Sequence, residues 1–134
     1  MKKQQHLNFD SKVIHAGQSP DPTTGAVMQP IYATSTYAQS SPGVHQGYEY
    51  GRSENPTRMA FERCLAELEG VSLGLAFSSV LAAMTAVIDH LDAGSHMITT
   101  DDLYGGSFRL INRIKTRTSN ISFTQVDMSD MGAF

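Results

Sequence analysis

The sequence predicts an α/β fold, and the second half of the chain supplies the observations behind this prediction. The apolar run at 73–77 is typical of a buried strand, and 96–100 and 121–126 are two further strand candidates. Two helical patterns, over 81–91 and 107–116, separate them. Strands that alternate with helices in this way indicate right-handed crossovers and a parallel sheet.

A helix is predicted just before the first of these strands. Asn55 is a residue type that caps helices, and Pro56 suits the first helical turn, where its missing N–H costs nothing. Gly70 is typical of a helix end. Between them the apolar residues recur at the i, i+3, i+4, i+7 spacing of one helix face. They are Phe61, Cys64, Leu65 and Leu68.

The first 54 residues have a different character. They show weak periodicity and many turn formers, as in "QSPDPTTGAVMQP" and "SSPGVHQG". A segment this long without a core of its own usually lies on another surface, either of its own domain or of another subunit. We therefore predict an N-terminal arm over 1–54 and an α/β domain over 55–134. Because a parallel sheet needs cover on both faces, we expect 55–134 to be only the first part of that domain.

The composition narrows the class of protein. The chain has 134 residues, of which 40% are hydrophobic and 17% charged, as in a globular protein. A net charge of −3 gives no reason to expect nucleic acid or an acidic membrane as partner. Cys64 is the single cysteine, which favours a reducing compartment. "MKKQQHLNF" lacks the apolar run of a secretory signal, and no stretch is long enough to cross a bilayer, so we expect a cytoplasmic protein.

Two segments lie where a parallel sheet binds ligands, beyond the carboxyl ends of its strands. In "FSSVLAA" a strand leads through a turn into a helix, whose free N–H groups favour an anion such as phosphate. Ser78 and Ser79 can add hydroxyl donors, although this turn taken alone favours Ser79 as a simple helix cap. In "DDLYGGSFR", Tyr104 can stack on a flat ring, or it can be a half-buried residue of a tight turn.

A third candidate is "GYEYGRSENPTR", residues 47–58, which combines two tyrosines, two arginines and the start of a helix. This composition suits a docking surface for an anion, and the alternative is a polar loop that leads into a capped helix. No metal site is predicted, because the five histidines are scattered without ligand spacing. Cys64 lies on the apolar helix face and is expected to belong to the core.

Six segments in order give the chain a resemblance to a known family. They are "IHAGQ", "TGAVMQPIYATSTY", "YEYGRSENPTR", "LAELEG", "FSSVLAA" and "DDLYGGSFR". The chain resembles the amino-terminal third of the Cys/Met-metabolism enzymes that use pyridoxal 5′-phosphate, namely cystathionine γ-synthase, γ-lyase and β-lyase. The resemblance covers nearly all 134 residues. It implies the start of the three-layer α/β/α large domain of the fold type I transferases, a homotetramer, and an amino-acid substrate in transsulfuration and methionine biosynthesis.

The resemblance also assigns roles to residues of the arm. In this family the tyrosine and arginine of the "YxYxR" segment cross a subunit boundary and bind the cofactor phosphate of a neighbour. The matching residues are Tyr50 and Arg52, and Arg52 is also expected near the substrate. A guanidinium and a phenol are suitable donors to a phosphate. On this interpretation the arm lacks a core because it lies on a partner chain.

The remaining site residues follow from the same resemblance. The turn Ser79–Val80–Leu81 corresponds to the family's own phosphate-binding turn. Tyr104 corresponds to the aromatic residue that stacks on the pyridine ring and takes part in proton transfer, and Arg109 to an arginine near the substrate. The family has glycine at position 80. We expect the β-branched Val80 to weaken cofactor binding, with about 1–3 kcal/mol of strain if its backbone is forced into an unusual region.

A second departure concerns the Schiff-base lysine, which in the family lies further along the full-length chain. None of the lysines in the chain matches such a motif; they are Lys2, Lys3, Lys12 and Lys115. We therefore expect the 134 residues alone to be inactive. The alternative is a non-catalytic interaction module that associates with a full-length homologue. The sequence does not separate synthase from γ-lyase or β-lyase, nor a natural truncation from a piece of a longer protein. It also leaves open whether the fragment folds alone.

Overall fold

The computed structural model describes residues 7–130 and 132, and it divides into two compact units. The first is Met1–Ala76 and the second Phe77–Phe134. The arm predicted over 1–54 falls within the first unit, together with the helix that follows it, and the boundary at 54/55 stays a prediction.

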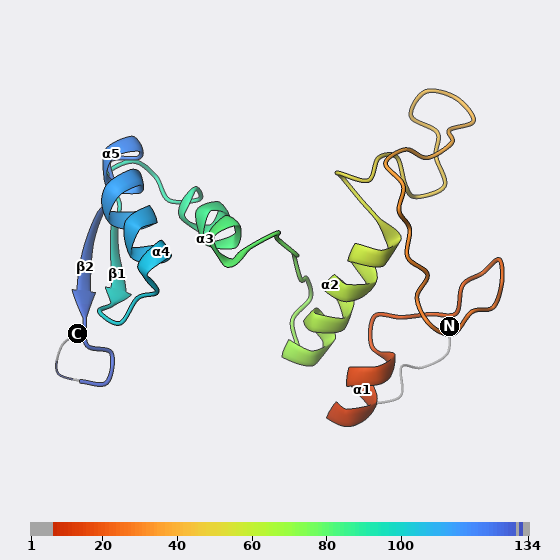
Figure 1. Ribbon diagram of the computed structural model, residues 1–134, viewed down its shortest axis with the longest axis horizontal. Helices are drawn as coiled ribbons and strands as arrows, with labels where there is room; N and C mark the ends of the chain where they lie inside the picture. Colours follow the sequence, from red (N-terminus) through yellow and green to blue (C-terminus); the bar gives the residue numbers. More distant parts are fainter. Residues whose placement is uncertain (1–6, 131, 133–134) are drawn as a thin grey trace. The chain divides into compact units, whose positions relative to one another are not determined.

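From residue 7 onward, the first unit contains the helices α1 (Phe9–His15) and α2 (Pro56–Glu69) (Figure 1). The predicted ends of α2 are confirmed. The side chain of Asn55 accepts hydrogen bonds from the N–H groups of the first turn, and Pro56 opens the helix. Gly70 ends it in the left-handed region, at φ 69°. The local cap chemistry is therefore sufficient to place this helix in the chain.

The apolar face of α2 is less covered than the periodicity predicts. Its buried residues are Ala60 and Ala66, whereas Phe61 is 55% exposed and Leu65 42%. Cys64 is only partly buried, which corrects its expected place in the core. Residue Gly17, which follows α1, lies against the α2 backbone so closely that a Cβ there would come within 2.6 Å of the Ala60 carbonyl oxygen.

Polar contacts hold the irregular segment that follows α1. The carboxylate of Asp21 accepts hydrogen bonds from the N–H groups of Thr23 and Thr24, from the Thr24 hydroxyl and from the Tyr32 hydroxyl. These bonds, led by that of the Thr24 N–H, lower the pKa of Asp21. The bond to Asp21 in turn raises the pKa of Tyr32. Hydrogen bonds to Asp21, and not a cluster of apolar side chains, therefore hold this segment.

The second unit contains the predicted parallel pairing. Strands β1 (His96–Thr100) and β2 (Ser122–Val126) pair in parallel, with His96 opposite Ser122 and Thr100 opposite Val126. Helix α3 (Val80–Ile88) precedes β1. The crossover between the strands is one helical stretch of three segments: α4 (Gly105–Arg109), the π-helical η1 (Leu110–Lys115) and α5 (Thr116–Thr118). The structure confirms helices at both predicted places, 81–91 and 107–116, but their ends differ from the predicted ones.

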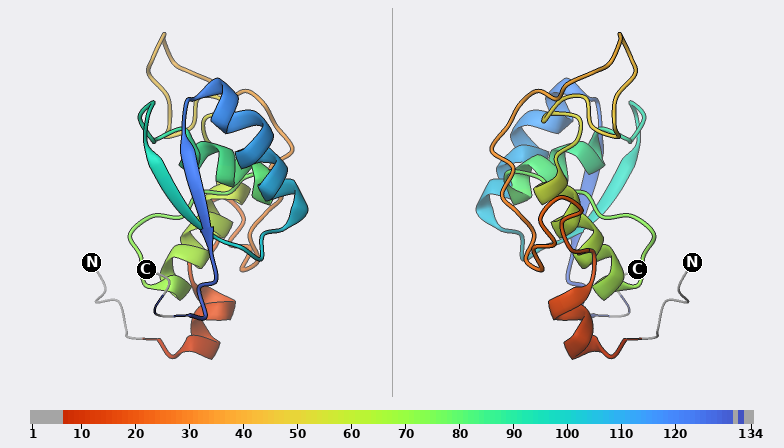
Figure 2. Two further views of the ribbon diagram at one scale, coloured as in Figure 1. Left: turned by 90° about the vertical axis from the view of Figure 1, so that its left-hand side faces the viewer. Right: turned by 90° about the vertical axis from the view of Figure 1, so that its right-hand side faces the viewer.

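An apolar core joins these elements. Ile88, Ile111 and Ile121 are its buried centre, and partly buried side chains of both strands and the helices pack around them. Figure 2 shows the crossover helix alongside the two strands. At the margin of the core, the Lys115 ammonium pairs with the Asp89 carboxylate at the end of α3. The ion pair avoids the cost of leaving a buried ammonium without a partner.

The strand predicted over 73–77 is wrong for this structure. Residues 73–77 form no regular element, and the side chains of Leu73, Leu75 and Phe77 are 69%, 67% and 45% exposed. An apolar run becomes a strand only when a neighbouring strand takes its N–H and C=O groups. Within the described residues no strand pairs with this run. Separately, none of the described helices combines the length and the apolar character needed to cross a membrane.

Candidate functional site

The first part of the candidate site is a turn at Tyr50–Ser53. Tyr50 pairs with Thr36 in an isolated antiparallel bridge, and the Gly51 N–H donates to the Ser35 carbonyl at 2.7 Å. The N–H groups of Ser53 and Glu54 both donate to the Tyr50 carbonyl, at 3.0 and 2.9 Å. The backbone of the turn is therefore fixed by hydrogen bonds on both sides of Arg52.

The two predicted phosphate-binding side chains of the arm lie together on this turn. The guanidinium carbon of Arg52 is 5.0 Å from the centre of the Tyr50 ring, a cation–π contact. Both side chains are exposed, and with Thr34 and Ser35 they border a shallow hollow of about 230 Å³. Arg52 makes no ion pair with any residue from 7 to 130. An exposed guanidinium beside a phenol is chemically suited to an anionic group from outside the unit.

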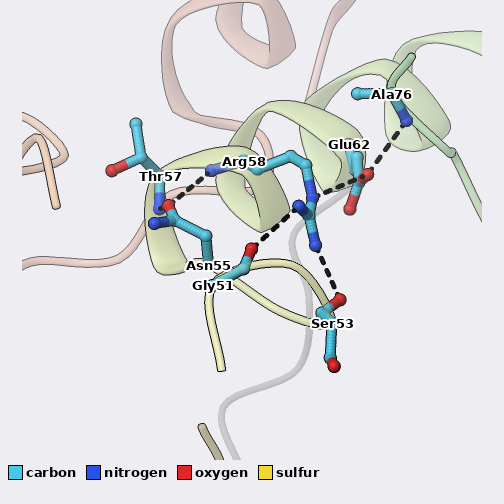
Figure 3. Close-up of polar contacts among 7 residues, drawn as sticks. All are labelled: Gly51, Ser53, Asn55, Thr57, Arg58, Glu62 and Ala76. Carbon is cyan, nitrogen blue, oxygen red and sulfur yellow. Dashed lines mark hydrogen bonds and ion pairs between the residues drawn. The ribbon is translucent and has the colours of Figure 1, made fainter. Parts of the chain in front are cut away.

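The sequence interpretation missed Arg58, which holds this turn from α2. Its guanidinium donates to the carbonyl of Gly51 at 3.2 Å and to that of Ser53 at 2.6 Å, and its Nε lies 3.5 Å from Glu62 Oε1 (Figure 3). The same Glu62 oxygen accepts from the Ala76 N–H at 2.9 Å. The i, i+4 spacing of Arg58 and Glu62 was a usable signal for the ion pair, but nothing in the sequence shows the two carbonyl contacts.

The second part of the candidate site is the start of α3. Ser79 caps this helix, and its hydroxyl oxygen accepts from the Ala82 N–H at 3.1 Å. The capping interpretation of Ser79 is confirmed. The N–H groups of Val80 and Leu81, in the first turn, have no acceptor among the described residues. A helix start with two free donors carries partial positive charge and suits an anion.

The backbone at Val80 is not strained. Val80 is the first residue of α3, and the one described non-glycine residue with positive φ is Asn120. The expected strain cost at position 80 is therefore absent. The remaining difference from glycine is steric. The Val80 side chain is 72% exposed and lies beside the free N–H groups.

Tyr104 and the start of α3 are brought together by Gly106. Tyr104 follows β1 and precedes α4, and its side chain is 73% exposed. A Cβ on Gly106 would meet the Tyr104 ring at 2.6 Å and the Leu81 side chain at 3.2 Å. The ring thus lies over the backbone of a buried glycine, next to Leu81. An open aromatic face beside a helix start is the combination that a flat ring with a phosphate arm requires.

Arg109 lies on the same short helix as Gly105 and Gly106. Its side chain is exposed, and one terminal nitrogen would lie 3.8 Å from a Cβ on Gly105. The structure thus groups Tyr50 with Arg52 in the first unit. In the second unit it groups Ser79, Val80, Leu81 and Tyr104, with Arg109 on the adjoining turn. No cluster of three metal-ligating side chains occurs within residues 7–130 and 132.

Comparison with known proteins gives these groups a context. The family model of the Cys/Met metabolism PLP-dependent enzymes matches residues 10–134. A cystathionine β-lyase of Coxiella burnetii is 56% identical over 128 residues, which are 96% of this chain and 33% of the relative. A probable cystathionine γ-synthase of Herpetosiphon aurantiacus is 51% identical over 91% of this chain and 38% of its own length.

Solved structures agree with the sequence relatives. A cystathionine γ-lyase from Lactobacillus plantarum, complexed with L-serine, has a TM-score of 0.87 and 45% identity over 95% of this chain and 33% of its own. The metB structure from Corynebacterium glutamicum has a TM-score of 0.90 and 39% identity over 96% of this chain and 35% of its own. The chain thus spans about a third of the length of the relatives it matches.

Proposed function

Because the chain belongs to the family of Cys/Met metabolism PLP-dependent enzymes, we propose that it contributes the phosphate-binding and ring-stacking groups of an enzyme acting on cystathionine or a related amino acid. The bonds formed or broken are C–S bonds. The observation that carries this proposal is the exposed pair Tyr50 and Arg52, whose guanidinium has no ionic partner within the described residues. A cytoplasmic location remains a prediction.

The residues present fit pyridoxal 5′-phosphate, the cofactor of this family. The free N–H groups of Val80 and Leu81, with the Ser79 hydroxyl, would hold the phosphate from one chain. Tyr104 would stack on the pyridine ring and hold a proton at its hydroxyl oxygen for transfer to or from the substrate. When bound, the cofactor supplies an electron sink for negative charge on substrate carbon.

Tyr50 and Arg52 would donate to the same phosphate from a neighbouring chain, which makes the site a seam between two copies. Exposure of both side chains supports this assignment, because groups that serve another subunit must be presented outward. Arg109 and Arg52 would attract the carboxylate of the amino-acid substrate. The homotetramer and the N-terminal arm over 1–54 belong to the same proposal.

We further propose that the 134 residues do not complete a catalytic cycle alone. Lys12 donates to the Glu67 carbonyl at 3.2 Å and Lys115 pairs with Asp89, so both are engaged elsewhere. Lys2 and Lys3 lie outside the described residues. The second candidate function, a non-catalytic module bound to a full-length homologue, is favoured by one observation: the apolar run 73–77 is exposed and open to a partner.

Mixing two variants of the complete enzyme tests the shared site. Arg52→Met and Tyr104→Ala should each abolish most activity. If residue 52 serves the neighbour and residue 104 its own site, a mixed dimer keeps one intact site. Half of randomly mixed dimers are hybrids, so about a quarter of wild-type activity should return. No recovery would place both residues in one subunit's site and overturn the proposal. Arg117→Met, an exposed arginine on α5, is the control.

A further inference from the structure

The Tyr50–Ser53 turn carries the side chains that the proposed function assigns to a neighbour's phosphate, yet it has little apolar support. Tyr50 is 36% exposed, and Arg52, Ser53 and Glu54 are all exposed. A turn with so few packed atoms opens easily unless polar contacts hold it. The orientation of the Arg52 guanidinium therefore depends on whatever fixes the backbone of its two neighbours.

Besides the backbone hydrogen bonds of the turn, the fixing contact is made by Arg58, in the first turn of α2. Its two terminal nitrogens reach the carbonyl of the residue before Arg52 and the carbonyl of the residue after it, at 3.2 and 2.6 Å. A planar guanidinium can donate to two such acceptors at once, which a lysine ammonium on a flexible stem does less well. Hydrogen bonds from a charged donor are also about twice as strong as neutral ones.

Glu62 orients Arg58 for this contact. Its Oε1 lies 3.5 Å from Arg58 Nε, and the side chains are 33% and 16% exposed, so the pair is partly shielded from water. Because Nε faces Glu62, the two terminal nitrogens are left for the carbonyls (Figure 3). The same carboxylate oxygen binds the Ala76 N–H, three residues before the Ser79 cap. Glu62 thus connects the turn to Ala76, at the end of the first unit.

We propose that Arg58 is a positioning residue, which clamps the carbonyls of Gly51 and Ser53 so that Tyr50 and Arg52 present their donors to the cofactor phosphate. The proposal rests on the proposed function, since that function gives Tyr50 and Arg52 their role. Arg58 itself touches neither cofactor nor substrate on this assignment. Its effect passes through the backbone of the turn.

Arg58→Gln in the complete enzyme, purified without cofactor, tests the clamp. Amide hydrogen exchange of residues 51–54 should become about tenfold faster, because the turn opens more often. The dissociation constant of pyridoxal 5′-phosphate, measured by its absorbance, should rise about tenfold, the equivalent of roughly 1.4 kcal/mol. Arg58→Lys, which keeps the charge beside Glu62, should show most of both effects. It also carries the test if the glutamine variant does not fold.

Arg63→Gln is the matched control. Arg63 lies on α2, is exposed, and makes no hydrogen bond or ion pair within the described part of the chain. It should change neither readout. Equal changes in Arg63→Gln and Arg58→Gln would overturn the proposal, as would Arg58 variants within about twofold of wild type. Faster exchange with unchanged cofactor affinity would overturn the positioning role as well.

Arg52→Met separates this inference from the proposed function. If Arg52→Met leaves cofactor affinity unchanged, the assignment of Arg52 to the phosphate fails, and with it the cofactor half of this proposal. Exchange in residues 51–54 then decides the clamp alone. If Arg52→Met weakens cofactor binding and Arg58→Gln does not, the proposed function stands and the clamp is refuted.

Discussion

The two units of the chain are stabilised in opposite ways. The second unit has a buried centre of Ile88, Ile111 and Ile121, on which two strands and their helices pack. Polar contacts hold the irregular segments of the first unit, from the Asp21 carboxylate at one place and the Arg58 guanidinium at another. Apolar packing depends on volume and is insensitive to pH, whereas polar contacts depend on single atoms and on charge. Different substitutions should therefore break each unit.

The largest effect is expected in the core of the second unit. Ile111 is 1% exposed, and Ile111→Ala should lower the free energy of unfolding by about 2–5 kcal/mol through lost contacts and a cavity. Ile114→Ala, in the same helix with 49% of its side chain exposed, is the control and should cost far less. Denaturant titration measures both. Hydrogen exchange in the Asp21 segment should change less, and an equal loss of protection there would contradict the different stabilisation of the two units.

A smaller effect is expected where α1 meets α2. Gly17 has φ +69°, and a Cβ there would lie 2.4 Å from the Cys64 nitrogen. Gly17→Ala should cost about 1–3 kcal/mol from backbone strain, plus the shift of α2 that the contact demands. Gly25→Ala shares the positive φ, at +73°, but meets nothing within 4 Å. Thermal unfolding measures the midpoints of both variants. If Gly17→Ala and Gly25→Ala lower the midpoint equally, the close approach at Gly17 contributes nothing.

A pH-dependent effect is expected at Asp21. Its pKa is lowered from 3.8 by the bonds it accepts, first that of the Thr24 N–H, so its contribution is complete above 3.8 and is lost as the pH falls through the lowered value. The pKa of Tyr32 is raised from 10.0 by Asp21, so its contribution is lost only when the pH rises through that higher value.

Asp21→Asn should remove the contribution that the Asp21 carboxylate makes to stability within this pH range. The variant should be less stable than wild type between about pH 4 and 10, with the difference shrinking below that range. Melting temperatures across pH provide the measurement, and Asp130→Asn is the control at an exposed carboxylate that does not bond a tyrosine. A difference that persists unchanged at pH 2 would exclude the charge as its cause.

The smallest effect is expected at Val80, where the second unit meets its proposed ligand. Because the backbone of Val80 is unstrained, only the bulk of its side chain opposes a phosphate. Val80→Gly should tighten cofactor binding by less than about tenfold, or 1.4 kcal/mol. The cofactor dissociation constant of the complete enzyme measures this. Val87→Gly, at the far end of α3 and 69% exposed, controls for loosening of the helix; unchanged affinity in Val80→Gly would refute the crowding.

Sequence reasoning succeeded where the determining interaction is local. The cap at Asn55, the end at Gly70 and the cap at Ser79 are each fixed by residues within four positions. The parallel pairing of β1 and β2 also follows from alternation along the chain. The family resemblance, carried by contiguous motifs, is confirmed by the match over residues 10–134.

It failed where the determining interaction is distant. The strand predicted over 73–77 requires a neighbour that the described residues do not provide, and periodicity cannot report a neighbour. The apolar face of α2 was predicted from residue spacing, yet Phe61 on that face is 55% exposed. Spacing identifies an apolar helix face but does not show whether another element packs on it. Arg58 was missed because its acceptors are backbone carbonyls five and seven residues away, which no side-chain pattern encodes. The roles of Tyr50, Arg52 and Tyr104 stay predictions.

The bare run at 73–77 has a consequence for handling the chain in the laboratory and in the cell. It combines three large apolar side chains with no charge and no proline, which is the signature of segments that stack into intermolecular β-structure. If these residues leave the ribosome with no surface to cover them, we expect a chaperone to bind them. Leu75→Lys would act as a gatekeeper, and we expect it to raise the soluble yield of the isolated chain while leaving its helices intact.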